Sequence, residues 1–231
     1  MPTITIKATD GSGSFQAYLQ EPQSQPAGAV VVIQEIFGVN QAMRDTCAWV
    51  ADLGFIAVCP DLFWRIEPGI DITDKTEAEW KRAFDLFGKF DKTKGIDDLK
   101  ATLAAARTLP NANGKAATMG YCLGGLLAFM MAEQSDADVN ISYYGVGLDT
   151  LLGDLAKVTK PLIVHIADQD EYFPEEGRAM VAAATKDHQR IACYNYNANH
   201  AFARINGVHW DGRSAAIANG RSAEALVKAL G

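Results

Sequence analysis

The sequence predicts an α/β fold, in which a mostly parallel central sheet lies between helices on both of its faces. Short β-branched runs alternate along the chain with longer segments of helical periodicity, which is the pattern of strand–helix–strand units. The runs are continuously apolar, as in "AVVVI", rather than alternating with polar residues. Continuous apolar runs are typical of strands that are buried on both faces.

Length and composition are those of one globular domain. The chain has 231 residues, of which 48% are hydrophobic and 21% charged. It contains no internal repeat, low-complexity tract or linker, so we expect a single domain over residues 1–231. The net charge of −7 argues against nucleic acid as a partner, because phosphate binding requires a basic face.

Several features predict a cytoplasmic protein without a membrane partner. The first residues, "MPTITIKATDGSGSF", lack the charged start and the apolar run of a signal peptide. No apolar run approaches the ~18 residues of a membrane span. The four cysteines lie far apart and form no CxxC pair, so we expect free thiols in a reducing compartment.

The first expected elements are an edge hairpin and a strand–helix–strand unit. Two short runs, Thr3–Lys7 and Phe15–Leu19, flank the turn sequence "DGSG", which favours a hairpin. The β-branched run Gly28–Glu35 predicts a buried strand. Apolar spacing then predicts a helix over Gln41–Leu53, which a glycine ends, and Phe55–Pro60 is the next expected buried strand.

A loop, two helices and a further strand–helix pair come next. Proline and glycine predict a loop over Asp61–Thr73, and apolar spacing predicts helices over Asp74–Phe90 and Ile96–Leu109. The run Lys115–Tyr121 predicts a strand, and a helix over Leu123–Ala132 is expected almost directly after it.

The last part of the chain continues the alternation. We expect strands over Val139–Gly145, Lys160–Asp168 and Arg190–Tyr196, and helices over Glu175–Lys186 and Arg213–Leu230. Strands that alternate with helices in this way join into a mostly parallel sheet that helices cover on both faces.

The stretch "GYCLGG" places Cys122 between a predicted strand and a predicted helix. Its form G-x-C-x-G is that of the nucleophile elbow of α/β-hydrolases, with cysteine in place of serine. Gly120 and Gly124 let chain segments approach where a Cβ would clash, and the start of the helix favours a thiolate. The alternative is a buried cysteine at a glycine-rich junction, and the pentapeptide alone does not decide between the two.

An acid and a histidine follow Cys122 in the order in which α/β-hydrolases place them. Asp168 and Asp170 lie in one turn after the strand "PLIVHIA", and His200 follows the strand "RIACYNY". Both positions come just past the carboxyl end of a strand, where open α/β sheets bind their ligands. Either aspartate fits the pattern, whereas His200 fits better than its rival His209, which no strand end positions.

Glu35 ends the buried run "VVVIQE", so we expect a carboxylate at the same edge of the sheet. Burying an unpaired carboxylate is costly, so Glu35 needs a partner or a function. The alternative is a salt bridge at the strand end. The histidines show no HxH or HExxH spacing, and we expect neither a metal nor an organic cofactor.

These residues resemble those of the dienelactone hydrolases (carboxymethylenebutenolidases), cysteine-nucleophile members of the α/β-hydrolase fold. The shared stretches run in order over nearly the whole chain: "QEIFGVN", "DLF", "GYCLGG", "YYGVGL", "DQDEYFP" and "NHAFAR". The resemblance implies one α/β-hydrolase domain over residues 1–231.

The resemblance also implies roles for the candidate residues. It implies a triad of Cys122, His200 and Asp170, and so selects between the two aspartates. It further implies that Glu35 pairs with the resting cysteine and takes part in its activation when substrate binds.

The implied chemistry is hydrolysis of a small-molecule ester or lactone through an acyl-enzyme. The backbone amides of Ile36 and Leu123 form the implied oxyanion hole. Conversion of dienelactone to maleylacetate by a monomeric enzyme is the specific expectation. The alternatives are a carboxylesterase or thioesterase for another small substrate, and a non-catalytic sensor that uses Cys122 as a reactive thiol.

Family members hold the substrate carboxylate with two arginines, of which this sequence matches one directly. Arg204, four residues after the histidine, corresponds to that one. The spacing to the aromatic residues Phe84 and Phe87 puts Trp80 where the other arginine is expected, and Phe84 replaces a common tyrosine. Arg82, half a helical turn away, is the candidate replacement, and it could substitute only with a local shift. We expect all five side chains in the substrate pocket.

Overall fold

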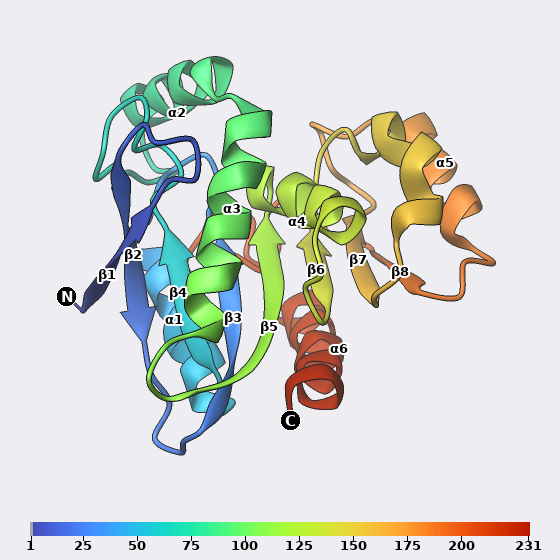
Figure 1. The fold of residues 1–231 in the computed structure, drawn as a ribbon. Helices are drawn as coiled ribbons and strands as arrows, with labels where there is room; N and C mark the ends of the chain where they lie inside the picture. The colour runs from blue at the N-terminus through green and yellow to red at the C-terminus, as the bar shows by residue number, and fades with distance from the viewer. Residues whose placement is uncertain (1) are drawn as a thin grey trace.

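The computed structural model describes residues 2–231, and their strands form one eight-stranded sheet (Figure 1). The strand order is β1-β2-β4-β3-β5-β6-β7-β8, in which β2 pairs antiparallel with β1 and β4 and the other pairs are parallel. The predicted mostly parallel sheet is confirmed. The strands are β1 (Thr3–Lys7), β2 (Ser14–Gln20), β3 (Ala27–Ile33), β4 (Ile56–Pro60), β5 (Ala112–Tyr121), β6 (Asn140–Tyr143), β7 (Leu162–Ala167) and β8 (Ile191–Tyr196).

Helices cover both faces of the sheet, as the continuous apolar runs predict. In β3, Val31 and Ile33 pack into one core with α3 and α4, whereas Val30 and Val32 pack into a second core with α1 and α6. Figure 1 shows α3 and α4 in front of the sheet and α1 and α6 behind it. The helices are α1 (Gln41–Asp52), α2 (Glu77–Lys89), α3 (Lys92–Arg107), α4 (Leu123–Gln134), the 3₁₀ helix η1 (Leu148–Lys157), α5 (Glu175–Thr185) and α6 (Gly212–Leu230).

Three helices differ from the sequence prediction. Helix α3 begins at Lys92 rather than Ile96, because the Asp91 side chain caps its first turn and accepts from the Thr93 and Lys94 amides. Helix α2 begins at Glu77 rather than Asp74, because the side chain of Thr76 caps its first turn and accepts a hydrogen bond from the Glu79 amide at 3.2 Å. The 3₁₀ helix η1 follows Gly147, which has a φ of 80°, and the sequence does not predict it. A 3₁₀ helix has three residues per turn and therefore lacks the α-helical periodicity on which the prediction rests.

The parallel strands bring their carboxyl ends, and the candidate residues, to one edge of the sheet. Cys122 follows the last residue of β5 directly, and Glu35 lies two residues past the end of β3. Asp170 lies three residues past β7, and His200 four residues past β8. Ligands of open α/β sheets bind at this edge. Within residues 2–231, no helix is both long and apolar enough to cross a membrane.

Candidate active site

Cys122 is the single residue between β5 and α4, and its backbone is strained. Its φ of 55° and ψ of −113° are unfavourable for a residue with a side chain. The surroundings fix this conformation, since the Cys122 amide donates to the Tyr143 carbonyl and the Cys122 carbonyl accepts from the Leu126 amide, each at 3.1 Å. The half-buried thiol lines a cavity at the carboxyl edge of the sheet.

Glycines on both sides of Cys122 let this turn form. A Cβ on Gly120 would lie 1.9 Å from the carbonyl oxygen of Gly124, and a Cβ on Gly124 would lie 2.3 Å from the carbonyl oxygen of Ile33. Both neighbours are backbone atoms, which cannot rotate away. The predicted close approach of chain segments around the cysteine is confirmed.

His200 and Asp170 form a buried hydrogen-bonded pair. The distance from His200 Nδ1 to Asp170 Oδ2 is 2.7 Å, and the other oxygen of Asp170 accepts from the Tyr172 amide at 2.9 Å. Asp168, the other aspartate of this turn, is exposed and accepts instead from the Asn195 side chain at 2.6 Å. The structure therefore places Asp170, and not Asp168, against the imidazole.

The imidazole of His200 lies between this carboxylate and Cys122. Burial alone lowers the pKa of His200, but the charge of a Cys122 thiolate and hydrogen bonds to Asp170 and Cys122 outweigh burial and raise the pKa to about 10. Because His200 Nδ1 is hydrogen-bonded to Asp170, it is Nε2 that contacts the sulfur of Cys122. An imidazolium at His200 and a thiolate at Cys122 thus stabilise each other. His209 is placed differently, with its Nδ1 3.2 Å from the backbone oxygen of His200.

Ile36 and Leu123 both line the cavity beside Cys122. Leu123 is the first residue of α4, so its amide has no acceptor within the helix and lies at the positive end of the helix dipole. Ile36 follows Glu35 in the segment after β3. The structure brings both residues to the thiol, which is where the sequence analysis expects an oxyanion hole.

The Glu35 carboxylate pairs with Arg204 rather than with Cys122. It is almost fully buried and accepts two hydrogen bonds from the guanidinium, from Nε at 2.6 Å and from Nη2 at 3.0 Å. The implied pairing of Glu35 with the resting cysteine is therefore not the arrangement in this structure. The salt bridge, which the sequence analysis kept as the alternative, is present.

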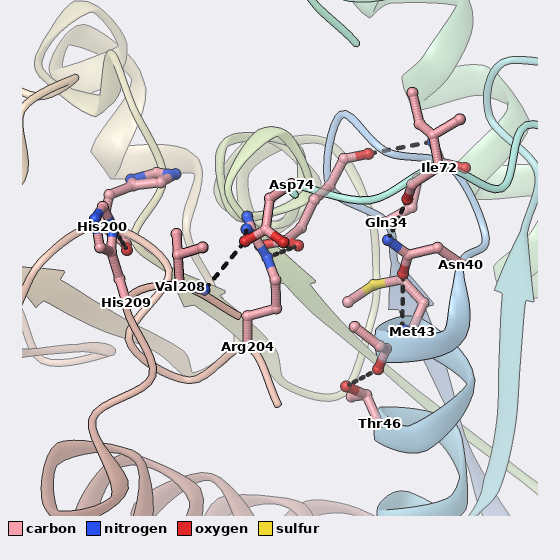
Figure 2. A network of polar contacts seen from close by, with 12 residues as sticks. Gln34, Asn40, Met43, Thr46, Ile72, Asp74, His200, Arg204, Val208 and His209 are labelled. Carbon is pink, nitrogen blue, oxygen red and sulfur yellow. Dashed lines mark hydrogen bonds and ion pairs between the residues drawn. The ribbon is translucent and has the colours of Figure 1, made fainter. Parts of the chain in front are cut away.

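Asp74 holds the same guanidinium from another side. Its Oδ2 accepts from Arg204 Nη1 at 2.5 Å and from the Val208 amide at 3.3 Å (Figure 2). Burial alone lowers the pKa of Arg204, but the charges and hydrogen bonds of Glu35, and the charge of Asp74, raise it well above its usual value. The sequence does not single out Asp74, because an acidic residue near a predicted helix start is common in solvated helix caps.

Helix α2 supplies an aromatic wall to the cavity. Trp80, Phe84 and Phe87 all line it, and the Trp80 ring lies 5.5 Å from the Phe84 ring. The expectation that Arg82 replaces a missing arginine is wrong: its guanidinium pairs with Glu67 and Asp85 outside the cavity. The rotation of α2 that turns Trp80 inward turns Arg82 toward solvent.

The cavity has a volume of about 440 Å³ and mostly apolar walls. Leu126 and Met130 from α4 and Leu151 from η1 continue the wall away from Cys122. Lys92, Arg204 and the imidazolium of His200 are the cationic groups among the residues that line it. In the described part of the chain, no group of three or more His, Cys, Asp or Glu side chains is arranged to hold a metal ion.

Comparison with known sequences connects this site to a family. A sequence profile of the Dienelactone hydrolase family matches residues 15–229. The chain is 48% identical to a provisionally named carboxymethylenebutenolidase of Azospirillum brasilense, with 100% of both chains covered. It is 39% identical to carboxymethylenebutenolidase 1 of Cupriavidus pinatubonensis, with 96% of this chain and 95% of that protein covered.

Solved structures show the same fold at lower sequence identity. A dienelactone hydrolase-like promiscuous phosphotriesterase from metagenomic libraries is 21% identical, with a TM-score of 0.80 over 100% of this chain and 99% of that chain. An esterase of Pyrococcus furiosus is 14% identical, with a TM-score of 0.73 over 98% of this chain and 91% of that chain. The architecture of an α/β-hydrolase is thus shared over essentially the whole chain.

We expect Gly124→Ala to destabilise the protein by about 2 kcal/mol, because the new Cβ must push apart backbone atoms. The matched control is Gly220→Ala in α6, where a Cβ meets nothing within 4 Å. That control should unfold at the same denaturant concentration as the natural chain or slightly above it. Equal urea midpoints for the two variants would contradict this role of Gly124.

The His200 imidazole should titrate near pH 10, and removing the Cys122 thiolate with Cys122→Ala should move its pKa downward. The reason is that the thiolate charge stabilises the protonated ring. NMR titration of ¹⁵N-labelled imidazole resonances measures both values. A His200 pKa near 6.5 that does not respond to Cys122→Ala would contradict the pairing.

Proposed function

The chain belongs to the dienelactone hydrolase family, and we propose that it hydrolyses a small ester or lactone with Cys122 as the nucleophile. The observation that carries the proposal is the strained turn that presents the Cys122 thiol to the cavity beside an imidazole bonded to a buried carboxylate. This is the arrangement that nucleophilic catalysis needs: a nucleophile, a base and a group that orients the base.

In the first half of the reaction, the Cys122 thiolate attacks the carbonyl carbon of the substrate. A C–S bond forms, and the carbonyl oxygen takes the negative charge of a tetrahedral intermediate. The amides of Ile36 and Leu123 are proposed to donate to this oxygen, and one such donor contributes about 3 kcal/mol to catalysis. The C–O bond to the leaving group then breaks. The leaving oxygen, an enolate in the case of dienelactone, takes the proton of the His200 imidazolium, which leaves the imidazole neutral.

In the second half, water hydrolyses the thioester. His200 accepts a proton from water through Nε2 while Asp170 holds Nδ1 and fixes the orientation of the ring. Attack of the water oxygen on the thioester carbon and cleavage of the C–S bond release the acid and restore the thiolate. The net reaction consumes one water and one ester or lactone, and it uses only groups of the chain.

Dienelactone is the first lactone to test, because the family and the named relatives bear names that refer to it. Its product, maleylacetate, would form through the thioester of Cys122. A second candidate substrate class is another small ester or thioester, which the replacement of an expected arginine by Trp80 favours. A non-catalytic thiol sensor would need neither Asp170 nor the cavity.

We expect Cys122→Ala and His200→Ala to lower kcat/KM for ester hydrolysis by about a thousandfold or more, because the nucleophile and its base act as a unit. Cys193→Ala is the matched control, since this half-buried cysteine of β8 does not line the cavity. It should retain full activity. Steady-state hydrolysis of dienelactone and of an uncharged 4-nitrophenyl ester measures these effects.

Turnover of either substrate that depends on Cys122 supports the proposal and identifies the substrate class. Turnover that persists in Cys122→Ala would show that another group is the nucleophile. A folded protein that cleaves neither substrate, but whose Cys122 reacts rapidly with iodoacetamide, would contradict the hydrolase mechanism and favour a thiol sensor.

A further inference from the structure

We propose that the cavity selects esters and lactones that carry an uncharged, apolar substituent, and that Asp74 determines this preference by occupying Arg204. The inference rests on the proposed function, because it concerns the substrate of the same cavity. It favours the second candidate class, another small ester or thioester, over dienelactone, which carries a carboxylate. It follows from the charges around Arg204, from the fixed position of Asp74 and from the nature of the walls.

The two negative charges that contact Arg204 already exceed its single positive charge. The guanidinium donates to Glu35 through Nε and Nη2 and to Asp74 through Nη1, so one cation faces two carboxylates. The three side chains are 6%, 1% and 4% exposed, so water screens them little. A substrate carboxylate at Arg204 would be the third negative charge on one cation, and repulsion from the other two would oppose its binding.

Asp74 cannot simply move aside when an anion arrives. Its carboxylate also accepts from the Val208 amide at 3.3 Å, and its backbone oxygen accepts from the indole nitrogen of Trp80 at 2.9 Å. These contacts tie Asp74 to the loop after β8 and to α2. Figure 2 shows Asp74 beside Arg204 with Val208 close by, and its hydrogen bonds to both residues hold the carboxylate at this place in the site.

The remaining wall offers apolar surface in place of a second cation. Trp80, Phe84 and Phe87 line one side, and Leu126 and Met130 line another. An alkyl or aryl substituent on the substrate would be removed from water by these side chains, which favours binding. An isolated carboxylate there would lose its hydration without gaining a partner.

Apart from Arg204 and the His200 imidazolium, which is paired with the Cys122 thiolate, Lys92 is the one cation among the residues that line the cavity, and it is exposed at the start of α3. A hydrated lysine at an exposed position attracts an anion weakly, because solvent screens the pair. It therefore does not offset the two buried carboxylates. The arrangement as a whole favours a neutral substrate.

The experiment compares two esters that differ in a single group. They are 4-nitrophenyl pentanoate and mono-4-nitrophenyl glutarate, in which a carboxylate replaces the terminal methyl of the acyl chain. We expect the natural chain to have a higher kcat/KM for the pentanoate. Asp74→Asn keeps the shape and an acceptor oxygen but removes the charge, and it should raise the glutarate-to-pentanoate ratio of kcat/KM by about tenfold.

Asp71→Asn is the matched control, because Asp71 lies three residues away and pairs with Arg44 rather than Arg204. It should leave the ratio unchanged. Should Asp74→Asn fail to fold, Asp74→Ser removes the same charge and keeps a hydroxyl oxygen that can accept from the Val208 amide. This variant should shift the same ratio in the same direction.

The outcomes separate this inference from the proposed function. Pentanoate cleavage that vanishes in Cys122→Ala supports the hydrolase mechanism whatever the ratio is. A natural chain that prefers the glutarate ester, or a ratio that neither variant changes, would overturn the assignment of Asp74 alone. Absence of any Cys122-dependent cleavage would overturn the proposed function, and this inference with it.

Discussion

The backbone of β5 turns into α4 at one residue, and the rest of the site depends on this turn. With no side chains on Gly120 and Gly124, the start of α4 lies against the carbonyl of Ile33 at the end of β3. Backbone contact of this kind leaves no room for adjustment, so Cys122 is fixed relative to the segment that follows β3. The bond from its amide to the Tyr143 carbonyl extends the constraint to β6. The position of the thiol is thus set by the sheet rather than by a loop.

The three buried charges at Arg204 connect the segments that the sheet does not hold. Glu35 follows β3, Asp74 precedes α2, and Arg204 lies in the loop after β8. Buried ion pairs add little net stability, but removing one partner leaves an unpaired charge and costs about 3–5 kcal/mol. The ion pairs of Arg204 with Glu35 and Asp74 therefore hold these three segments in one specific arrangement. The same contacts offset the positive charge of Arg204 at the cavity and hold together the segments that form the cavity walls.

Much of this arrangement could be predicted from the sequence, because it depends on local patterns and on chain order. Continuous apolar runs predict the strands, and in a parallel sheet the carboxyl ends of the strands lie at the same edge. Contacts between distant residues are different. Asp74 and Arg204 are 130 residues apart, and no local pattern marks them as partners. Whether Trp80 or Arg82 faces the cavity depends on how α2 is rotated about its axis. Packing of the Trp80 ring against the Phe37 ring, at 5.0 Å, fixes this rotation, and that contact forms only in the folded chain.

The paired state of Arg204 bears on how negative charge is stabilised during the proposed reaction. Charge moves from the Cys122 sulfur to the carbonyl oxygen of the substrate and back. Arg204 contributes little to either position, because Glu35 and Asp74 offset its charge. Both positions instead lie at the start of α4, where the Leu123 amide and the positive end of the helix dipole favour an anion. One helix end can thus stabilise the thiolate before attack and the oxyanion after it. This leaves the opposite side of the cavity free to bind the substrate through its shape and apolar surface.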